Sequence, residues 1–234
     1  MSVAIVTTGL ANVASVRAAL RRLGVEPRLT DDPREVREAR AVVLPGVGAL
    51  GPAMRRLTER STSGDTLAAA LSARIADERP TLAICLGLQL LCASSDEAPG
   101  ISGLCTFSAH VARLDAAPQL PHFGWNEVAP DAEMTFVPAG AAYFAHSYAA
   151  LAAPAPNSKG AKGAKGAKGA KDAATAVAWT SHGARFVSAF ERGAVLACQF
   201  HPELSGDYGA ELLERWLARS LPDRPRTLTE AATC

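Results

Sequence analysis

Residues 81–91 constrain the fold of this chain more than any other stretch. They read Thr-Leu-Ala-Ile-Cys-Leu-Gly-Leu-Gln-Leu-Leu, so a short apolar run leads into a cysteine, and a glycine and an apolar helical pattern follow. This order predicts a buried strand, a sharp turn and a helix, with Cys85 at the turn. Backbone N–H groups and the dipole at a helix N-terminus favour the thiolate form of such a cysteine. A buried core cysteine is the alternative, and a partner base elsewhere in the chain decides between the two.

Length and composition bound the class of protein. The 234 residues are 48% hydrophobic, which is ample for a core, and no run of 18 apolar residues predicts a membrane span. The N-terminal apolar run is too short for a signal peptide. Five cysteines without close pairs favour a reducing compartment, so we expect a cytoplasmic protein. The five histidines are scattered and no metal-binding spacing is found, so neither a metal nor a cofactor is expected.

One segment distorts the charge balance. The net charge is +1, but five lysines fall in a Lys-Gly-Ala repeat between Lys159 and Lys171, and the rest of the chain carries −4. The body therefore has no basic face that would suggest a nucleic-acid partner. Glycine at every third position opposes a helix, so residues 157–174 are predicted to be a disordered insertion. Long loops cost little free energy, so the fold can carry this one.

The remaining pattern predicts a single α/β domain. Strand and helix patterns alternate through the first 100 residues, which is typical of a parallel sheet that binds ligands at the C-terminal ends of its strands. Shorter strands follow at 109–114, 143–148, 176–180, 186–190 and 195–200, and the last two are spaced as a hairpin. We predict a mixed, mostly parallel central sheet flanked by helices over residues 1–221, with antiparallel additions in the second half. Residues 222–234 read as a flexible tail.

A base for Cys85 is found after the last strand. The apolar run 195–200 ends in His201-Pro202-Glu203. If this strand lies parallel to the cysteine strand, His201 reaches the same edge of the sheet. Glu203 can then accept a hydrogen bond from the imidazole, fix its tautomer and stabilise the imidazolium. A solvated His and Glu at a strand end is the alternative, but together with Cys85 a triad Cys85, His201, Glu203 is favoured.

The sequence resembles a known family. Five motifs carry the resemblance: Pro-Gly-Val-Gly at 45–48, Cys-Leu-Gly-Leu-Gln-Leu-Leu at 85–91, Pro-His-Phe-Gly-Trp-Asn at 121–126, Tyr-Phe-Ala-His-Ser-Tyr at 143–148 and Gln-Phe-His-Pro-Glu at 199–203. The chain resembles the class I glutamine amidotransferases. The first and third motifs point to the glutaminase subunits of imidazole glycerol phosphate synthase.

The resemblance implies a function and a set of residues. Glutamine would be hydrolysed to glutamate and ammonia by Cys85, His201 and Glu203. The backbone N–H groups of Leu86 and, after a peptide flip, of Val47 would form the oxyanion hole. The residues that match substrate-binding positions are Gly48, Gln89, His146 and Ser147.

The resemblance also implies a partner. The ammonia would pass to a (β/α)8-barrel cyclase subunit of histidine biosynthesis, and the chain has no second domain that could be this cyclase. Trp125, Asn126 and Tyr143 match interface positions, with Trp125 expected in a polar turn. A buried core tryptophan is the alternative for Trp125.

Three features depart from the family pattern, and two other functions stay open. Ala83 replaces a common glycine, Leu204 replaces a common lysine that pairs with the cyclase, and the lysine-rich segment is inserted. The chain could instead serve as the glutaminase of another class I amidotransferase, or as a catalytically silent regulatory subunit. The other cysteines are expected in the core, apart from the terminal Cys234.

Overall fold

The computed structural model describes residues 3–7, 12–62, 64–154 and 175–224. The predicted insertion at 157–174 and most of the predicted tail at 222–234 lie outside these residues. The proposed limits of the domain and of both segments therefore stay predictions.

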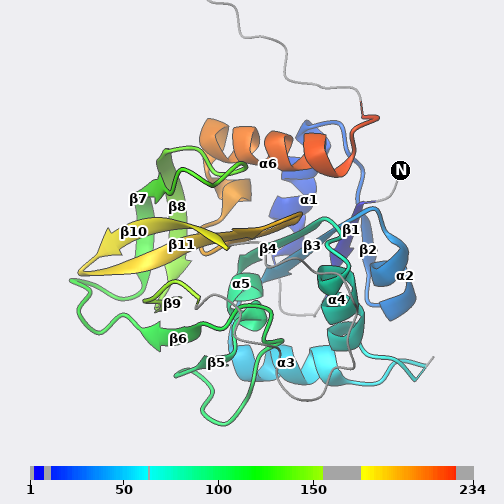
Figure 1. Cartoon of the computed structure of the whole chain (residues 1–234), viewed down its shortest axis with the longest axis horizontal. Helices are drawn as coiled ribbons and strands as arrows, with labels where there is room; N and C mark the ends of the chain where they lie inside the picture. Colours follow the sequence, from blue (N-terminus) through cyan, green and yellow to red (C-terminus); the bar gives the residue numbers. More distant parts are fainter. Residues whose placement is uncertain (1–2, 8–11, 63, 155–174, 225–234) are drawn as a thin grey trace, which may run out of the picture.

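A mixed nine-stranded sheet organises the described part of the chain (Figure 1). Its order is β2-β1-β3-β4-β12-β11-β10-β7-β8. The first five strands in this order are parallel to one another, and every pair from β12 to β8 is antiparallel. The strands are β1 (Val3–Val6), β2 (Arg28–Thr30), β3 (Ala41–Gly46), β4 (Thr81–Cys85), β7 (His122–Pro130), β8 (Gly140–His146), β10 (Ala176–His182), β11 (Ala184–Arg192) and β12 (Val195–Cys198). The predicted mixture of parallel and antiparallel strands is confirmed.

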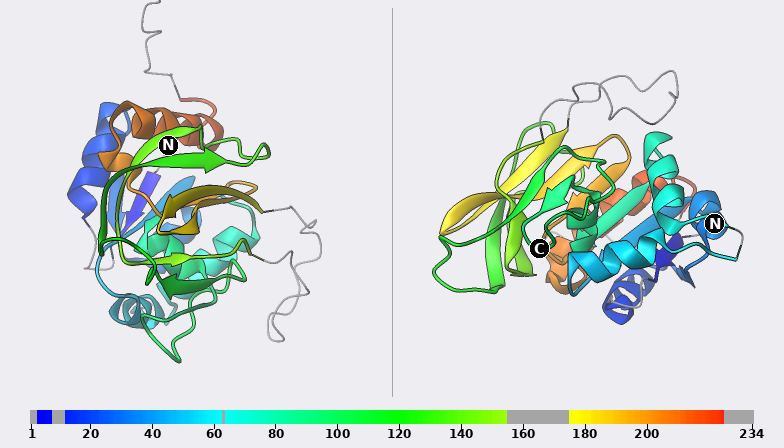
Figure 2. Two further views of the ribbon diagram at one scale, coloured as in Figure 1. Left: turned by 90° about the vertical axis from the view of Figure 1, so that its left-hand side faces the viewer. Right: turned by 90° about the horizontal axis from the view of Figure 1, so that it is seen from below.

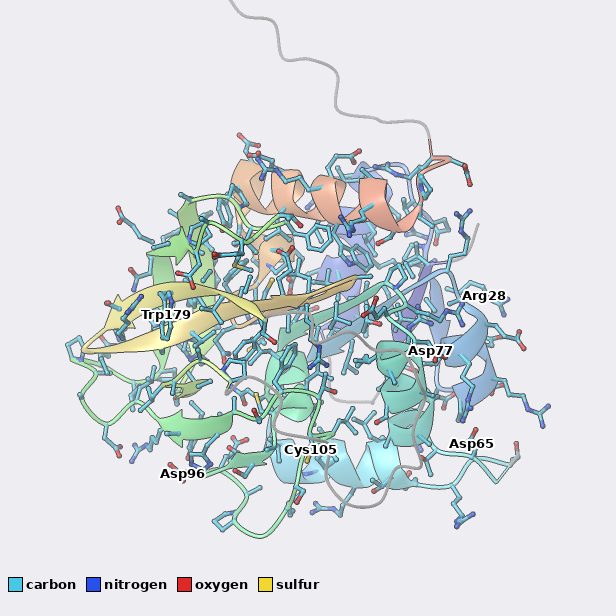
Figure 3. All side chains as sticks on the ribbon, in the orientation of Figure 1. Arg28, Asp65, Asp77, Asp96, Cys105 and Trp179 are labelled. Atoms are coloured by element: carbon cyan, nitrogen blue, oxygen red, sulfur yellow. The ribbon has the colours of Figure 1, made fainter. Side chains whose placement is uncertain are left out.

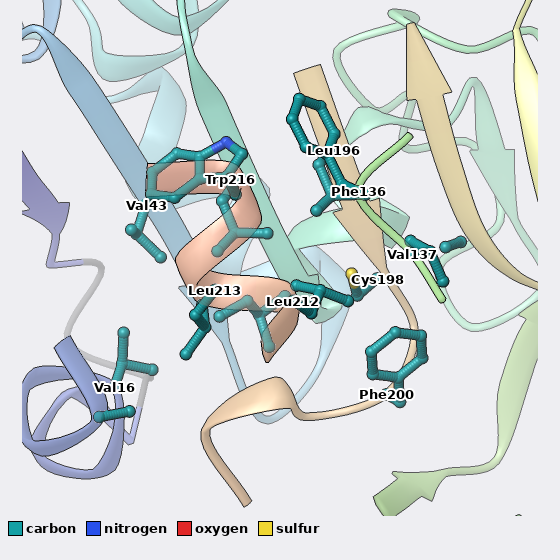
Figure 4. Packing of buried hydrophobic residues seen from close by; sticks show 14 of the residues in the cluster. Val16, Val43, Phe136, Val137, Leu196, Cys198, Phe200, Leu212, Leu213 and Trp216 are labelled. Atoms are coloured by element: carbon teal, nitrogen blue, oxygen red, sulfur yellow. The ribbon is translucent and has the colours of Figure 1, made fainter. Parts of the chain in front are cut away.

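Helices cover both faces of the parallel half of the sheet, as Figures 1 and 2 show. They are α1 (Val13–Arg22), α2 (Pro33–Glu38), α3 (Leu50–Thr58), α4 (Leu67–Ala76), α5 (Leu86–Leu91) and α6 (Gly206–Ser220), with a 3₁₀ turn η1 (Pro202–Leu204) before α6. On one face, α1 and α6 pack against the sheet (Figure 4). On the other face, α2 to α5 do the same.

The alternation of side chains on each strand produces these two cores. On β3, Val43 points to the side of α1 and α6, while Val42 and Leu44 point to the side of α3 to α5. Because the central strands are covered on both faces, β3 and β4 are apolar, apart from Thr81 at the start of β4, rather than alternating with polar residues.

A second, three-stranded sheet borders the large one. Its order is β5 (Ser94–Ser95), β6 (His110–Arg113) and β9 (Tyr148–Ala150). Only Ser147 separates β8 from β9, so the chain leaves the large sheet and enters the small one at this residue. Residues on either side of this crossing line the pocket described below.

A buried arginine fixes the beginning of the cysteine strand. Arg74 is 1% exposed, and its guanidinium donates hydrogen bonds to the carbonyl oxygens of Val36, Ala39 and Pro80 and to the hydroxyl of Thr81. Burial lowers the pKa of Arg74 to about 10, so the guanidinium stays charged at neutral pH. Arg74 thus ties the end of α2 to the start of β4.

Most predicted elements are found, and two local predictions are wrong. The expected hairpin of the last two strands is β11 and β12, and the closing helix is longer than the predicted 208–217. Trp125, predicted in a polar turn, lies inside β7, which pairs antiparallel with β8 over seven residue pairs. Cys105, labelled in Figure 3, was expected in the core but is exposed.

Candidate active site

Cys85 lies at the tip of a strained turn between β4 and α5. Its φ and ψ are 53° and −109°, a sparsely populated region for any residue other than glycine. The turn is close-packed, because a Cβ on Gly87 would lie 2.1 Å from the carbonyl oxygen of Leu44 on β3. The predicted strand, turn and helix are therefore present. Cys85 is only 6% exposed, but its thiol opens into a pocket.

The strand that leads to His201 is the parallel neighbour of β4. Cα partners pair Ala197 with Ala83 and Cys198 with Ile84, so both strands end at the same edge of the sheet. This arrangement brings the imidazole of His201 to Cys85. His201 Nδ1 lies 2.9 Å from Oε1 of Glu203, and both side chains are buried. The backbone N–H of His201 donates to the carbonyl oxygen of Tyr143 at 2.9 Å, which ties the histidine to β8.

The surroundings of His201 favour its charged form. Burial lowers the pKa of the imidazole, but hydrogen bonds with Cys85 and Glu203 outweigh burial and raise it to about 10. A protonated imidazole beside a thiol is the arrangement that stabilises a thiolate. The site therefore places a protonated imidazole beside the thiol of Cys85.

A pocket of about 430 Å³ gathers nearly all the predicted site residues. Its walls include Val47, Gly48, Cys85, Leu86, Gln89, His146, Ser147 and His201. Glu203 stands behind His201 rather than in the wall. The pocket is also lined by Asn12, Glu97, Pro121, Phe123 and Leu204, which the sequence did not single out for binding. A larger hollow of about 550 Å³ beside α2 is lined mainly by charged side chains and holds no thiol.

Gln89 faces inward rather than into solvent. It is 5% exposed, and its Nε2 donates to the carbonyl oxygen of Tyr148 at 2.9 Å and to Oε1 of Gln199 at 3.2 Å. Gln199 is fully buried and its Nε2 lies 3.7 Å from Sγ of Cys85. In the sequence, Gln199 stood out only as part of a motif. Its signal was a polar residue directly after an apolar strand and two positions before His201.

A hydrogen bond connects His146, in the pocket wall, to His122 behind it. His146 Nδ1 lies 3.0 Å from the carbonyl oxygen of Tyr148, and its Nε2 lies 3.2 Å from Nδ1 of His122. His122 Nε2 in turn accepts from Nδ2 of Asn126 at 3.2 Å. Since a carbonyl only accepts, His146 carries its proton on Nδ1, and His122 must donate to it. No sequence pattern assigned a role to His122.

Burial keeps these two imidazoles neutral. It is the main cause that lowers the pKa of His146 to about 3 and that of His122 to about 4, and the mutual repulsion of neighbouring histidines adds to it. His122 also stacks on the ring of His182 at 4.0 Å between centroids. His146 is therefore a neutral side chain in the pocket wall, and its hydrogen bond with His122 orients its ring.

Exposed apolar side chains lie beside the pocket. Trp125 is 58% exposed and meets the half-buried Tyr143 edge to face at 6.2 Å. Phe123 is 64% and Leu204 41% exposed, and both belong to the pocket wall. The amide of Asn126, which was predicted at an interface, makes hydrogen bonds within the fold, since Nδ2 donates to His122 and to the carbonyl oxygen of Ser181. We call Phe123, Trp125, Tyr143 and Leu204 the apolar rim.

Two other described cysteines, Cys92 and Cys198, are buried away from the pocket. Burial raises the pKa of Cys92 to about 12 and that of Cys198 far above the ordinary value for a thiol. Both lie in the core, as expected. Within the described ranges, no group of three or more His, Cys, Asp or Glu is arranged to hold a metal ion. No described helix is long and apolar enough to cross a membrane.

This fold with a cysteine at the strand–helix turn defines a class. Residues 5–219 match the glutamine amidotransferase class-I family, and the chain belongs to this family. Two solved structures share the fold. One is a crystal structure of a glutamine amidotransferase, with a TM-score of 0.66 and 15% identity over 93% of this chain and 98% of that one. The other is PurLQS from Thermotoga maritima, with a TM-score of 0.62 and 13% identity over 93% and 98%.

The curated relatives show which type of class I glutamine amidotransferase the chain is similar to. The chain is 39% identical to imidazole glycerol phosphate synthase subunit HisH of Symbiobacterium thermophilum, over 92% of both chains. It is 38% identical to the HisH subunit of Nocardia farcinica, over 92% of this chain and 97% of the relative. The HisH subunit of Carboxydothermus hydrogenoformans is 36% identical, over 88% and 93%.

Proposed function

We propose that this chain is the glutaminase subunit of an imidazole glycerol phosphate synthase. It hydrolyses glutamine to glutamate and ammonia and delivers the ammonia to a (β/α)8-barrel cyclase subunit. One observation carries the proposal: a strained cysteine and a buried His–Glu pair end neighbouring parallel strands and meet at one pocket. The similarity to HisH subunits over nearly the whole chain supports the choice of this amidotransferase among others of the class.

The first half of the reaction makes a thioester. The Cys85 thiolate attacks the side-chain amide carbon of glutamine, and a tetrahedral intermediate with an oxyanion forms. His201, held protonated by Glu203, gives its proton to the amide nitrogen as the C–N bond breaks and ammonia leaves. The short contact between Nδ1 of His201 and Glu203 supports this role, since it directs Nε2 towards the reacting groups.

The second half of the reaction hydrolyses the thioester and restores the free enzyme. Neutral His201 takes a proton from water, and the resulting hydroxide attacks the thioester carbon. The C–S bond breaks, glutamate leaves, and the sulfur departs as the thiolate beside a protonated His201. Cys85 is 6% exposed and His201 5%, so the enclosed site limits the access of other nucleophiles.

The oxyanion needs two N–H donors. Leu86 is the first residue of α5, where the N–H has no partner inside the helix. The second donor would come from Val47 in the glycine turn, whose Gly48 has a φ of +94°. A peptide flip in this turn would switch the second donor on or off. Loss of one such donor typically costs about 2.7–4 kcal/mol of transition-state stabilisation.

The apolar rim supports the docking of the cyclase on this face. Large apolar side chains that are half exposed or more, such as Phe123 and Trp125, are typical anchors of an interface. They stand beside the mouth of the pocket, so a partner docked here would cover the site and receive the ammonia. Leu204 replaces a common lysine in the family, so at this position the contact would be apolar rather than ionic.

The test is glutamate release from glutamine in the presence of the barrel cyclase and its ribulosyl substrate. The variant Cys85→Ser should lose more than roughly 1,000-fold in rate, because serine cannot replace the thiolate as nucleophile. Cys105→Ser, which removes an exposed thiol, is the matched control and should keep the parental rate.

The outcomes separate the alternatives. Turnover that depends on Cys85 and rises with the cyclase supports the proposal. A rate of glutamate release that the cyclase does not change, but that another synthase raises, would favour a different amidotransferase of the class. Binding to the cyclase without any turnover in the parent chain would identify a silent regulatory subunit.

A further inference from the structure

The side chain of Gln199 contacts the sulfur of Cys85, and the proposed mechanism assigns it no role. It follows β12. Its neighbours Cys198 and Phe200 point towards α1 and α6, while Ala197 points towards α5. The alternation therefore directs Gln199 to the side of α5, where Gln89 meets it. Gln199 is 0% exposed, so its amide must find its partners inside the protein.

The hydrogen bonds fix the orientation of both amides. The carbonyl oxygen of Tyr148 can only accept, so the atom of Gln89 that faces it is Nε2. The same nitrogen also faces Gln199, so the atom of Gln199 at this contact is the acceptor Oε1. Nε2 of Gln199 is then directed at Sγ of Cys85, at 3.7 Å. One main-chain carbonyl thus determines that an N–H, and not an oxygen, points at the sulfur.

We propose that Gln199 is a second hydrogen-bond donor to the thiolate of Cys85, held in place by Gln89. This inference rests on the proposed function, in which Cys85 is the nucleophile. His201 donates to the sulfur only while it is protonated, and it gives up its proton when ammonia leaves. Gln199 keeps its N–H throughout the cycle. It therefore donates to the sulfur again when the C–S bond of the thioester breaks, beside the reprotonated His201.

The experiment is the pH profile of Cys85 alkylation by iodoacetamide in the full chain. Alkylation is followed on the peptide that contains Cys85, so that the other cysteines do not contribute. Gln199→Met keeps the length of the side chain but removes the donor. Because a hydrogen bond to the charged form favours it, the midpoint of the profile should move up by about one pH unit. Well below the midpoint, alkylation should slow about tenfold.

Ser188→Ala is the matched control. Ser188 is also fully buried, and its backbone carbonyl accepts from the N–H of Gln199 on the neighbouring strand. Removal of its hydroxyl disturbs the same part of the core without touching the sulfur, so the midpoint should stay within about 0.2 pH unit of the parent. An equal shift in both variants would indicate a packing effect and overturn the inference.

A measurement on the parent chain covers the case in which Gln199→Met does not fold. The side-chain amide proton signals of Gln199 should shift in NMR spectra as Cys85 titrates, and they should not shift in Cys85→Ala. An amide signal that ignores the titration would overturn the inference. If Cys85 of the parent reacts no faster than the exposed Cys105, the proposed function itself fails. A reactive Cys85 with an unchanged Gln199→Met profile removes only the role of Gln199.

Discussion

Single side chains set the protonation states of the pocket. His201 is charged because its partners Cys85 and Glu203 outweigh burial, whereas His146 is neutral because burial dominates and its neighbours are histidines. Two imidazoles in one pocket therefore differ in charge at neutral pH. This difference suits one to proton transfer and the other to a passive wall.

The neutral histidine leads to a prediction for stability. The folded pKa of His146 is lowered to about 3, below the value of about 6.5 in an unfolded chain. Its contribution to the free energy of unfolding is present above about pH 6.5 and is lost as the pH falls towards 3. Between these values only the unfolded state binds the proton, so the slope is about 1.4 kcal/mol per pH unit.

His146→Gln removes this titration while keeping an amide donor and acceptor. Urea unfolding of the parent and the variant at pH 7, 6, 5 and 4 measures the slope. The decline of stability with acid should be shallower in the variant by about 1.4 kcal/mol per pH unit in the lower part of this range. Parallel curves would contradict a buried neutral His146.

At the scale of elements, the junction of β4 and α5 decides where the site forms. The carbonyl oxygen of Leu44 on β3 occupies the place where a side chain at position 87 would begin. Only glycine allows α5 to start this close to the sheet. The spacing of Cys85 and Gly87 was visible in the sequence, but the oxygen that excludes other residues belongs to a different strand.

Gly87→Ala should therefore lower the free energy of unfolding by about 3 kcal/mol, because the backbone must move to admit the methyl group. Glutamate release should fall as well, since α5 carries Leu86 and Gln89. Gly51→Ala in α3 is the control: its Cβ would meet Ile101 at an ordinary 3.4 Å, and alanine favours a helix by about 0.5–1 kcal/mol. Urea unfolding compares the two, and equal effects would contradict the steric argument.

At the scale of the whole molecule, the apolar rim and the proposed catalytic groups lie at the same edge of the sheet. Trp125 comes from β7, Tyr143 from β8 and Leu204 from the turn after His201. The N–H of His201, the proposed catalytic base, donates a hydrogen bond to the carbonyl oxygen of Tyr143 in the rim. A partner that covers the rim would thus touch the backbone that holds the base.

Trp125→Ala tests the rim. The dissociation constant of the complex with the barrel cyclase should rise by about 30-fold, or about 2 kcal/mol, because a large exposed anchor is lost. The free energy of unfolding of the chain alone should stay near that of the parent. Leu29→Ala, an exposed apolar residue on the edge strand β2 at the other end of the sheet, should leave the dissociation constant unchanged. Titration calorimetry measures both, and equal affinities for all three chains would exclude Trp125 as an anchor.

The sequence by itself determined the fold class and the outline of the candidate site. Periodicity shows which segments are strands or helices, and a cysteine at a strand–helix turn or a His-Pro-Glu after a strand is local information. The tertiary structure alone decided the rest. The roles of Gln199 and His122 and the exposure of Trp125 depend on which strands are neighbours. Strand order arises from contacts between residues far apart in the chain, and no local pattern records these contacts.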